Sequence, residues 1–300
     1  MKYFSLRILC VLSLLLGIQT AGLASAEDAS QAVPANLTTE QFPGHSFTFL
    51  NLPADQQSVG YKIFTPEQAE QGDQSSPANF AEHFAKEATV DKVILDPATK
   101  EYLVYLTVNN TGEQLAERTR NGQLSSLVLT SDLINAKEQF MGKTIYPKTR
   151  NLSGSDDVTT PVLIGSAVTV VDVVASSQAQ KPISLVVSVN GKNAILPIAY
   201  SWTNIPSTDW SSAPAWQEDL FIQDPRTTLG WSSVVWENIE KASVIENMTK
   251  DQVLLSWGKP SRTDNNATTW IYGSKKLNFS GNVVSSIETI PETAPIETIK

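Results

Sequence analysis

The pattern of hydrophobic and polar residues changes along this chain, and each change predicts a different kind of structure. Residues 8–18 are apolar almost throughout, follow Lys2 and Arg7, and lead to the small residues Ala24-Ser25-Ala26 before Glu27. This order is typical of a secretory signal peptide, residues 1–26, that is cleaved between Ala26 and Glu27. The apolar run is shorter than the ~20 residues that cross a bilayer, which argues against a membrane anchor.

Residues 27–45 are polar and aperiodic, so we expect a flexible leader, with packed structure starting near Ser46. Strand-like and helix-like patterns then alternate over residues 46–140, which predicts an α+β domain. The spacing of Phe80, Phe84 and Ala88 predicts an amphipathic helix over 79–89, and a second helix is expected over 112–121. Strand patterns occupy 46–52, 60–64, 91–96, 101–108 and 124–131.

The patterns in residues 141–204 are all typical of strands. Asn190-Gly191 stands between two alternating runs and predicts a tight hairpin, because both central residues of a type I′ turn need positive φ. Four or five short strands favour a small β-barrel of the SH3-like type. Residues 205–230 contain prolines, serines and tryptophans, and we expect an ordered linker that packs against a neighbouring domain.

Residues 231–290 predict two helices followed by three strands, before a frayed tail at 291–300. Ser232 can cap a helix that runs to about Ser243. Thr249 and Gln252 form a capping box for a second, two-turn helix, whose apolar residues are Val253, Leu254 and Trp257. Gly258 stands where a left-handed C-cap is needed, and Pro260 prevents the helix from continuing.

The order of these signals resembles the BamE family, also called the small protein A/OmlA family. The resemblance covers about 60 residues and rests on a Met-Thr-Lys helix start, a Gly-x-Pro stop and two aromatic strands. The matching residues are Met248, Thr249, Lys250, Val253, Gly258, Pro260, Trp270, Tyr272, Phe279, Gly281 and Val284. Asn247 replaces a glycine of the family pattern, at a position where asparagine can also take a left-handed conformation.

The resemblance implies two helices packed on a three-stranded antiparallel sheet, a fold that also occurs in the β-lactamase inhibitor proteins. It further implies a protein-binding unit of the bacterial cell envelope without enzymatic activity. BamE itself is an accessory of the outer-membrane β-barrel assembly machine. Members of the family are usually short and lipid-anchored, whereas this chain carries a long additional N-terminal part, so only the fold is expected to transfer directly.

Charge and composition narrow the classes of function. The chain has 22 basic and 31 acidic residues, a net charge of -9, and loses two of the basic residues, Lys2 and Arg7, with the signal peptide, which gives -11. This balance argues against nucleic acid as a partner. Cys10, the only cysteine, lies inside the apolar run, so a lipid anchor is not expected and thiolate chemistry is excluded from the mature chain.

No residue pattern points to catalysis, a cofactor or a metal. The two histidines, His45 and His83, stand far apart, and no nucleophile or phosphate-binding motif occurs. Five tryptophans fall within 35 residues of one another; Trp210 and Trp216 among them are candidates for a glycan-binding surface, although packing between domains is the favoured role.

The sequence therefore predicts a non-enzymatic periplasmic or secreted bacterial protein. Its BamE-like module is expected to contact an envelope protein, and envelope assembly is the cellular process in which such a contact is expected. One alternative is a protein that binds peptidoglycan or another envelope glycan through the barrel and the tryptophans. A second alternative is a secreted hydrolase, or an enzyme inhibitor, that sequence motifs do not reveal.

Overall fold

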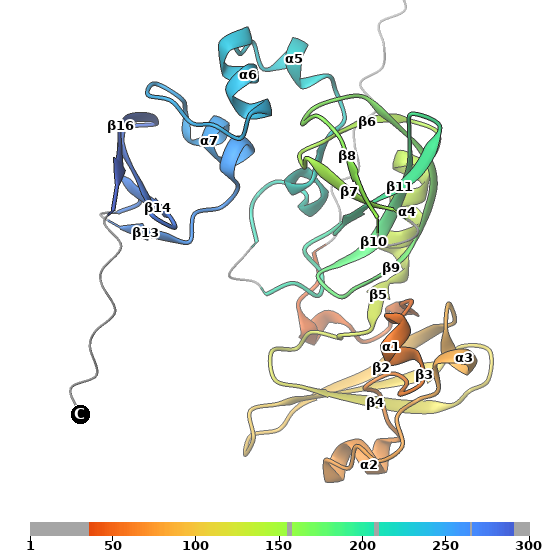
Figure 1. The fold of residues 1–300 in the computed structure, drawn as a ribbon. Helices are drawn as coiled ribbons and strands as arrows, with labels where there is room; N and C mark the ends of the chain where they lie inside the picture. The colour runs from red at the N-terminus through yellow and green to blue at the C-terminus, as the bar shows by residue number, and fades with distance from the viewer. Residues whose placement is uncertain (1–35, 155–157, 207–209, 265, 291–300) are drawn as a thin grey trace, which may run out of the picture. The chain divides into compact units, whose positions relative to one another are not determined.

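A computed structural model describes residues 36–154, 158–206, 210–264 and 266–290. Its strands form three antiparallel sheets, with short helices between them (Figure 1). The expected α+β class is therefore confirmed. Within the described ranges, none of the helices combines the length and the apolar character that crossing a membrane requires.

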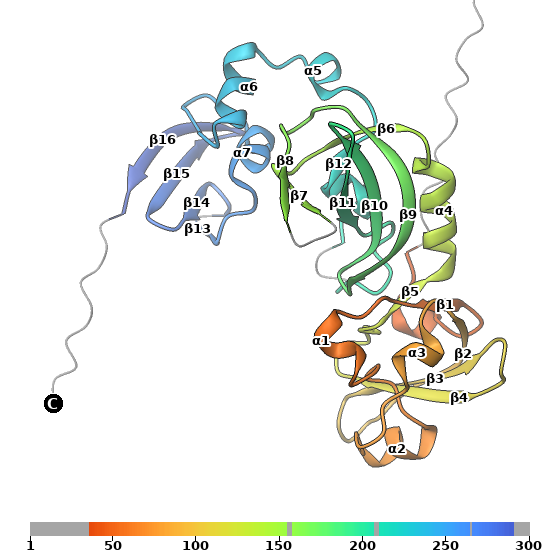
Figure 2. The same ribbon diagram turned by 45° about the vertical axis from the view of Figure 1, so that its right-hand side comes forward.

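The first sheet has the strand order β4-β3-β2-β1-β5. Its strands are β1 (Ser46–Phe49), β2 (Glu87–Leu95), β3 (Tyr102–Val108), β4 (Gln114–Thr119) and β5 (Leu127–Leu129). Helices α1 (Ala54–Gln57) and α3 (Phe80–His83) lie on one face, and α2 (Pro66–Gln71) lies on the opposite face (Figure 2). Both faces are packed, because Phe47 and Phe49 belong to the core on one face and Ala69 and Ala116 to the core beneath α2.

Two of the predicted helices in this region are wrong. The helix expected over 79–89 ends at His83, because Ala85 has a φ of +60° and the chain then enters β2, where Ala88 pairs with Phe47. The stretch expected to be helical over 112–121 instead forms β4 along β3. In both places the pairing with a distant strand outweighs the local pattern. The strands expected over 91–96 and 101–108 are confirmed, and they pair with each other as parts of β2 and β3.

Packed structure also begins before Ser46, where the sequence placed the end of a flexible leader. A short 3₁₀ helix, η1, covers Thr39–Gln41, and the Phe42 side chain is only 1% exposed. Phe42 meets Phe47 edge to face, with 5.0 Å between ring centroids. This contact fixes the end of the leader to the first core.

The second sheet has the strand order β12-β6-β9-β10-β11-β7-β8 and curls into a half-barrel (Figures 1 and 2). Its strands are β6 (Thr144–Pro147), β7 (Asn151–Gly154), β8 (Thr159–Pro161), β9 (Val168–Gln178), β10 (Lys181–Val189), β11 (Lys192–Ile198) and β12 (Leu220–Phe221). Helix α4 (Thr130–Phe140), which the sequence patterns did not predict, packs Ala136 and Phe140 into the same core.

The half-barrel has more strands than the four or five expected. One reason is β12, which comes from the predicted linker and pairs Leu220 with Pro147 of β6. The hairpin prediction is confirmed, since Asn190 and Gly191 have φ values of +50° and +76° between β10 and β11. The linker stretch also contains the 3₁₀ helix η3 (Ala215–Glu218) and the helix α5 (Pro225–Thr228).

The third sheet has the order β13-β14-β15-β16, with β13 (Arg262–Asp264), β14 (Thr269–Tyr272), β15 (Lys275–Ser280) and β16 (Val283–Thr289). Helices α6 (Ser233–Glu240) and α7 (Lys250–Trp257) precede it. Two helices are confirmed, but the sheet has four strands rather than the predicted three, because Arg262–Asp264 pairs along β14. We call residues 231–290 the C-terminal module.

Candidate functional site

The cap that the sequence predicts for the start of α7 is present, whereas the end of the helix differs from the prediction. Thr249 accepts a hydrogen bond from the backbone N–H of Gln252, and the Gln252 side chain accepts one from the backbone N–H of Thr249 at 2.8 Å. Asn247 has a φ of +69°, as its position requires. Gly258 has a φ of +77° but a ψ of -163°, so it is not the left-handed helical C-cap that was expected. Its extended ψ directs the chain away from the helix toward Pro260.

The buried face of α7 differs from the predicted one. Val253 is fully buried, and Ser256 is also buried and donates a hydrogen bond to the Ser243 carbonyl at 2.7 Å. With this bond in place, Leu254, one of the three apolar residues of the predicted helix, is 36% exposed. The helix therefore presents an aliphatic side chain on its outer surface.

Leu254 lines a hollow of about 470 Å³, which we call the α7 cleft. Segments far apart in the sequence build its walls, because Lys148, which follows β6, and residues of η3, β12 and α7 all contribute. Leu229 on its wall is 37% exposed, and Trp231 is half-buried against Trp236 with 5.2 Å between ring centroids. The lining residues are Lys148, Glu218, Phe221, Leu229, Trp231, Asp251, Leu254, Leu255, Gly258 and Lys259.

Lys148 places a positive charge in the wall of the α7 cleft. Its Nζ donates to the Gln217 carbonyl at 2.5 Å and lies 4.3 Å from the centroid of the Phe221 ring. Burial lowers the pKa of Lys148, against the opposing effect of the charges of Glu218, Asp219 and Asp251. Within the described ranges, no carboxylate forms an ion pair with this ammonium group.

The nearby carboxylates have other cations as partners. Glu218 pairs with Lys259 at 3.2 Å, and Asp219 pairs with Lys181 at 2.6 Å. Asp251 is exposed in the first turn of α7. A desolvated cation with one carbonyl and one ring as neighbours retains the capacity to bind an anion.

A second hollow, of about 380 Å³, lies beside Glu117 at the end of β4. The Glu117 side chain is buried, and its Oε1 accepts hydrogen bonds from the backbone N–H and the hydroxyl of Ser125, both at 3.0 Å. Its Oε2 has no partner among the described residues. Burial raises the pKa of Glu117 to about 7, although the charge of Lys62 acts in the opposite direction.

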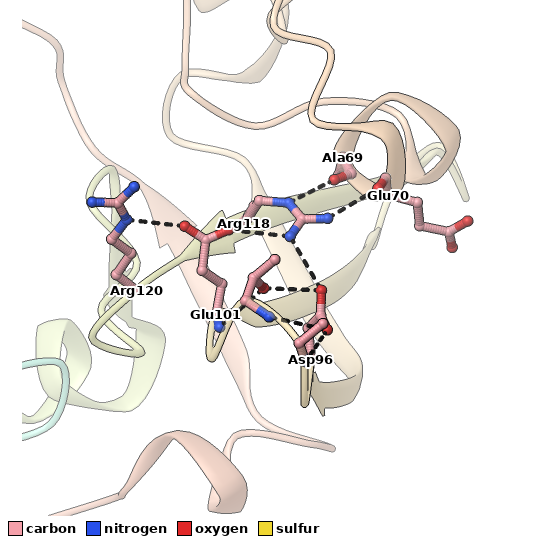
Figure 3. Close-up of polar contacts among 8 residues, drawn as sticks. Ala69, Glu70, Asp96, Glu101, Arg118 and Arg120 are labelled. Atoms are coloured by element: carbon pink, nitrogen blue, oxygen red, sulfur yellow. Dashed lines mark hydrogen bonds and ion pairs between the residues drawn. The ribbon is translucent and has the colours of Figure 1, made fainter.

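Arg118 also lines the hollow beside Glu117, but its guanidinium is fully engaged (Figure 3). It donates to the carbonyls of Ala69 and Glu70 at 3.0 and 2.9 Å. It also contacts the carboxylates of Glu101 at 3.1 Å and Asp96 at 3.7 Å. The C-terminal end of α2 and the β2–β3 hairpin thus share one cation, which is left with little capacity for a ligand.

Polar residues join the first sheet to the half-barrel near the same hollow. Asn204, with a φ of +65°, accepts from the backbone N–H of Leu124 and donates to the carbonyl of the same residue. Asp132, on the first turn of α4, accepts from the Ser201 hydroxyl at 2.5 Å. Burial raises the pKa of Asp132 to about 7. These groups are structural connections, because their hydrogen-bonding partners are within the chain.

The predicted motif residues serve mainly the core of the C-terminal module. Met248, Val253, Trp270, Phe279 and Val284 all belong to one buried cluster. Tyr272 packs at the edge of that cluster, and its hydroxyl donates to the Gly258 carbonyl at 2.8 Å. Gly281 has a φ of +61° in the β15–β16 turn. The motif residues therefore build the core on which α7, with its cleft-lining side chains, is packed.

The two tryptophans considered as a glycan platform differ in burial. Trp216 is 2% exposed and packs edge to face on Phe140, with 5.6 Å between ring centroids. Trp210 is half-buried, and its indole N–H donates to the Ile205 carbonyl. The favoured packing role agrees with this burial, because a buried ring cannot stack on a sugar.

The remaining expectations concern the signal cleavage site, the histidines and metal binding. The cleavage residues Ala26 and Glu27 lie outside the described residues. His83 is buried and bridges the Asn79 carbonyl and the Glu113 carboxylate at 2.8 and 2.9 Å. Among the described ranges, no group of three or more His, Cys, Asp or Glu side chains is arranged to hold a metal ion.

Lys148 and Glu117 were not singled out from the sequence. A lysine after a short alternating strand is usually solvated, so nothing in residues 144–148 distinguishes Lys148. Glu117 did leave a signal, because it stands two positions after the buried Leu115. In a strand, residues two positions apart point to the same face, so Leu115 and Glu117 share one. This signal was missed because residues 112–121 were expected to be helical.

Comparison with known proteins adds no assignment to this geometry. Neither a protein-family model nor any curated protein or solved structure matches the chain.

Proposed function

We propose that this protein is a non-enzymatic binding protein of the bacterial cell envelope and that its C-terminal module contacts another envelope protein through the α7 cleft. The observation that carries the proposal is the pair of half-exposed aliphatic side chains, Leu229 and Leu254, on the wall of a cleft beside aromatic rings. Apolar hollows of this kind take anchor side chains from a partner protein. Secretion to the envelope rests on the signal peptide at residues 1–26.

The arrangement of α6 and α7 with β14, β15 and β16 supports a BamE-like module, and the curled second sheet is compatible with an SH3-like origin of the half-barrel. Protein binding is the role that the BamE resemblance implies. A part in outer-membrane or envelope assembly is the corresponding cellular role. Glycan binding has less support, because Trp216 is buried in the core of the half-barrel.

Site-directed crosslinking tests the proposal in the cells that produce the protein. A photoactivatable residue is introduced at Leu254, on the wall of the cleft, and separately at Val234, which is 54% exposed on α6 and does not line the cleft. We expect irradiation to capture a defined envelope protein from position 254 and not from position 234. Mass spectrometry of the captured bands identifies the partner.

The proposal fails if both positions capture the same abundant proteins or if position 254 captures none. Leu254→Glu provides a second measurement, with Val234→Glu as its matched control. Both side chains are partly exposed, so neither change should unfold the module. Only Leu254→Glu is expected to reduce co-purification of the partner, because it places a charge in an apolar cleft.

A further inference from the structure

We propose that the α7 cleft recognises the C-terminal end of a partner polypeptide, with Lys148 binding the terminal carboxylate and the aliphatic wall binding an apolar last side chain. This inference rests on the proposed protein-binding function and names the chemistry of the partner.

The first argument is the unmatched charge of Lys148. Its ammonium has three N–H donors, and its contacts among the described residues are the Gln217 carbonyl and the face of the Phe221 ring, with three carboxylates acting from beyond ion-pair distance. Partly buried ammonium groups are costly unless an anion compensates them. A carboxylate from outside the chain would supply that anion and recover the cost of desolvation.

The second argument concerns the charges on each element that meets at the cleft. From η3, Glu218 is already neutralised by Lys259, and the adjacent Asp219 is neutralised by Lys181. From α7, Asp251 is exposed and forms no ion pair among the described residues. Among the described residues, the cleft therefore has one cation, Lys148, that is influenced by these carboxylates from beyond ion-pair distance, and one acidic group, Asp251, without an ion-pair partner.

The third argument is that one hollow holds both kinds of group, because Lys148 and the aliphatic side chains line the same cleft. Leu229 and Leu254 line this hollow and remain more than one-third exposed. A terminal residue of a polypeptide has an apolar side chain and a carboxylate on one carbon atom. Its backbone N–H groups can also donate to Asp251, which a simple fatty acid cannot do.

Fluorescence anisotropy with short labelled peptides tests the inference on the full mature chain. One peptide ends in leucine with a free carboxylate, and the other has the same sequence with a C-terminal amide. We expect the free acid to bind about tenfold or more tightly, because it alone forms a charge-assisted hydrogen bond with Lys148. Lys148→Met should abolish that preference, and Lys241→Met, an exposed lysine outside the cleft, should preserve it.

Equal binding of the acid and the amide to the natural protein would overturn the inference without requiring any variant. It is also overturned if Lys148→Met retains the preference, or if decanoate displaces the peptide as well as the free acid peptide does, since the ligand would then be an amphiphile. The proposed function fails separately, in the crosslinking experiment at Leu254. If position 254 captures a partner but the protein binds the acid and amide peptides equally, the proposed protein-binding function stands. The inference that the cleft binds a terminal carboxylate is then wrong.

Discussion

The hollow beside Glu117 and the α7 cleft are of similar size, yet their charged groups are arranged in opposite ways. In the first, the cation Arg118 has two carbonyls and two carboxylates as partners, and the acid Glu117 is left with an unpartnered oxygen among the described residues. In the second, the acids Glu218 and Asp219 are paired, and the cation Lys148 forms no ion pair with any described residue.

The difference separates an internal connection from a surface that can receive a ligand. Arg118 joins α2 to the β2–β3 hairpin, so its charge stabilises the fold. Among the described residues, Lys148 donates to one acceptor, the Gln217 carbonyl, and forms no ion pair, so its charge is available to a partner. Replacing the charged groups one at a time should therefore affect stability in the first hollow and binding in the second.

The largest expected effect is on the pH dependence of stability through Glu117. Its folded pKa of about 7 lies above the ordinary value of 4.5, so the folded state binds a proton more tightly than the unfolded state. The free energy of unfolding should then fall by roughly 3 kcal/mol for this group as pH rises from about 5 to 7, and it should stay constant at higher pH. Glu117→Gln, which resembles the protonated acid, should be more stable than the natural protein at pH 8 and similar to it at pH 5.

Chemical denaturation at pH 5 and pH 8 measures this difference. Asp132, with a pKa also raised to about 7, should leave a second pH-dependent component that Asp132→Asn removes. The comparison with the natural protein isolates Glu117 from all other titrating groups. A Glu117→Gln protein with an unchanged loss of stability between the two pH values would contradict the assignment.

A smaller effect is expected from Arg118→Met. The substitution removes the hydrogen bonds to the carbonyls of Ala69 and Glu70 while keeping the aliphatic part of the side chain. We expect a loss of about 2 kcal/mol in the free energy of unfolding. Arg120→Met is the matched control, because Arg120 contacts the same Glu101 carboxylate from a side chain that is 89% exposed.

Urea unfolding compares the two variants. Arg120→Met should leave the midpoint nearly unchanged, since exposed ion pairs contribute little. Similar losses from both substitutions would mean that the contact with Glu101 matters more than the contacts with α2.

The smallest effect on stability is expected from Lys148→Met. The substitution removes a partly buried charge and keeps a flexible side chain of similar length, so the free energy of unfolding should change by less than about 1 kcal/mol, with a gain as the favoured sign. Thermal unfolding checks this value. A loss as large as that of Arg118→Met would assign Lys148 a structural role and remove the contrast between the two hollows.

The predicted elements succeeded where neighbouring residues decide the backbone. The hairpin at Asn190-Gly191 and the capping box of Thr249 and Gln252 both appear as expected, because each depends on the φ angles or hydrogen bonds of a few adjacent residues. The helices expected over 79–89 and 112–121 failed, because strands far away in the sequence pair with those stretches. The spacing of apolar residues within one stretch does not show whether a distant strand will pair with it.

The sequence by itself determined the α+β class, the Asn190-Gly191 turn and the N-terminal cap of α7, since local chemistry is sufficient for each. Only the tertiary structure decided which side of α7 is exposed, because contacts with the rest of the module bury Ser256, which bonds to Ser243, and leave Leu254 exposed. It also decided the state of the two charges. Whether Lys148 or Arg118 has a partner depends on residues from remote segments that the fold brings together. The residues adjacent to Lys148 or Arg118 in the sequence do not indicate that pairing.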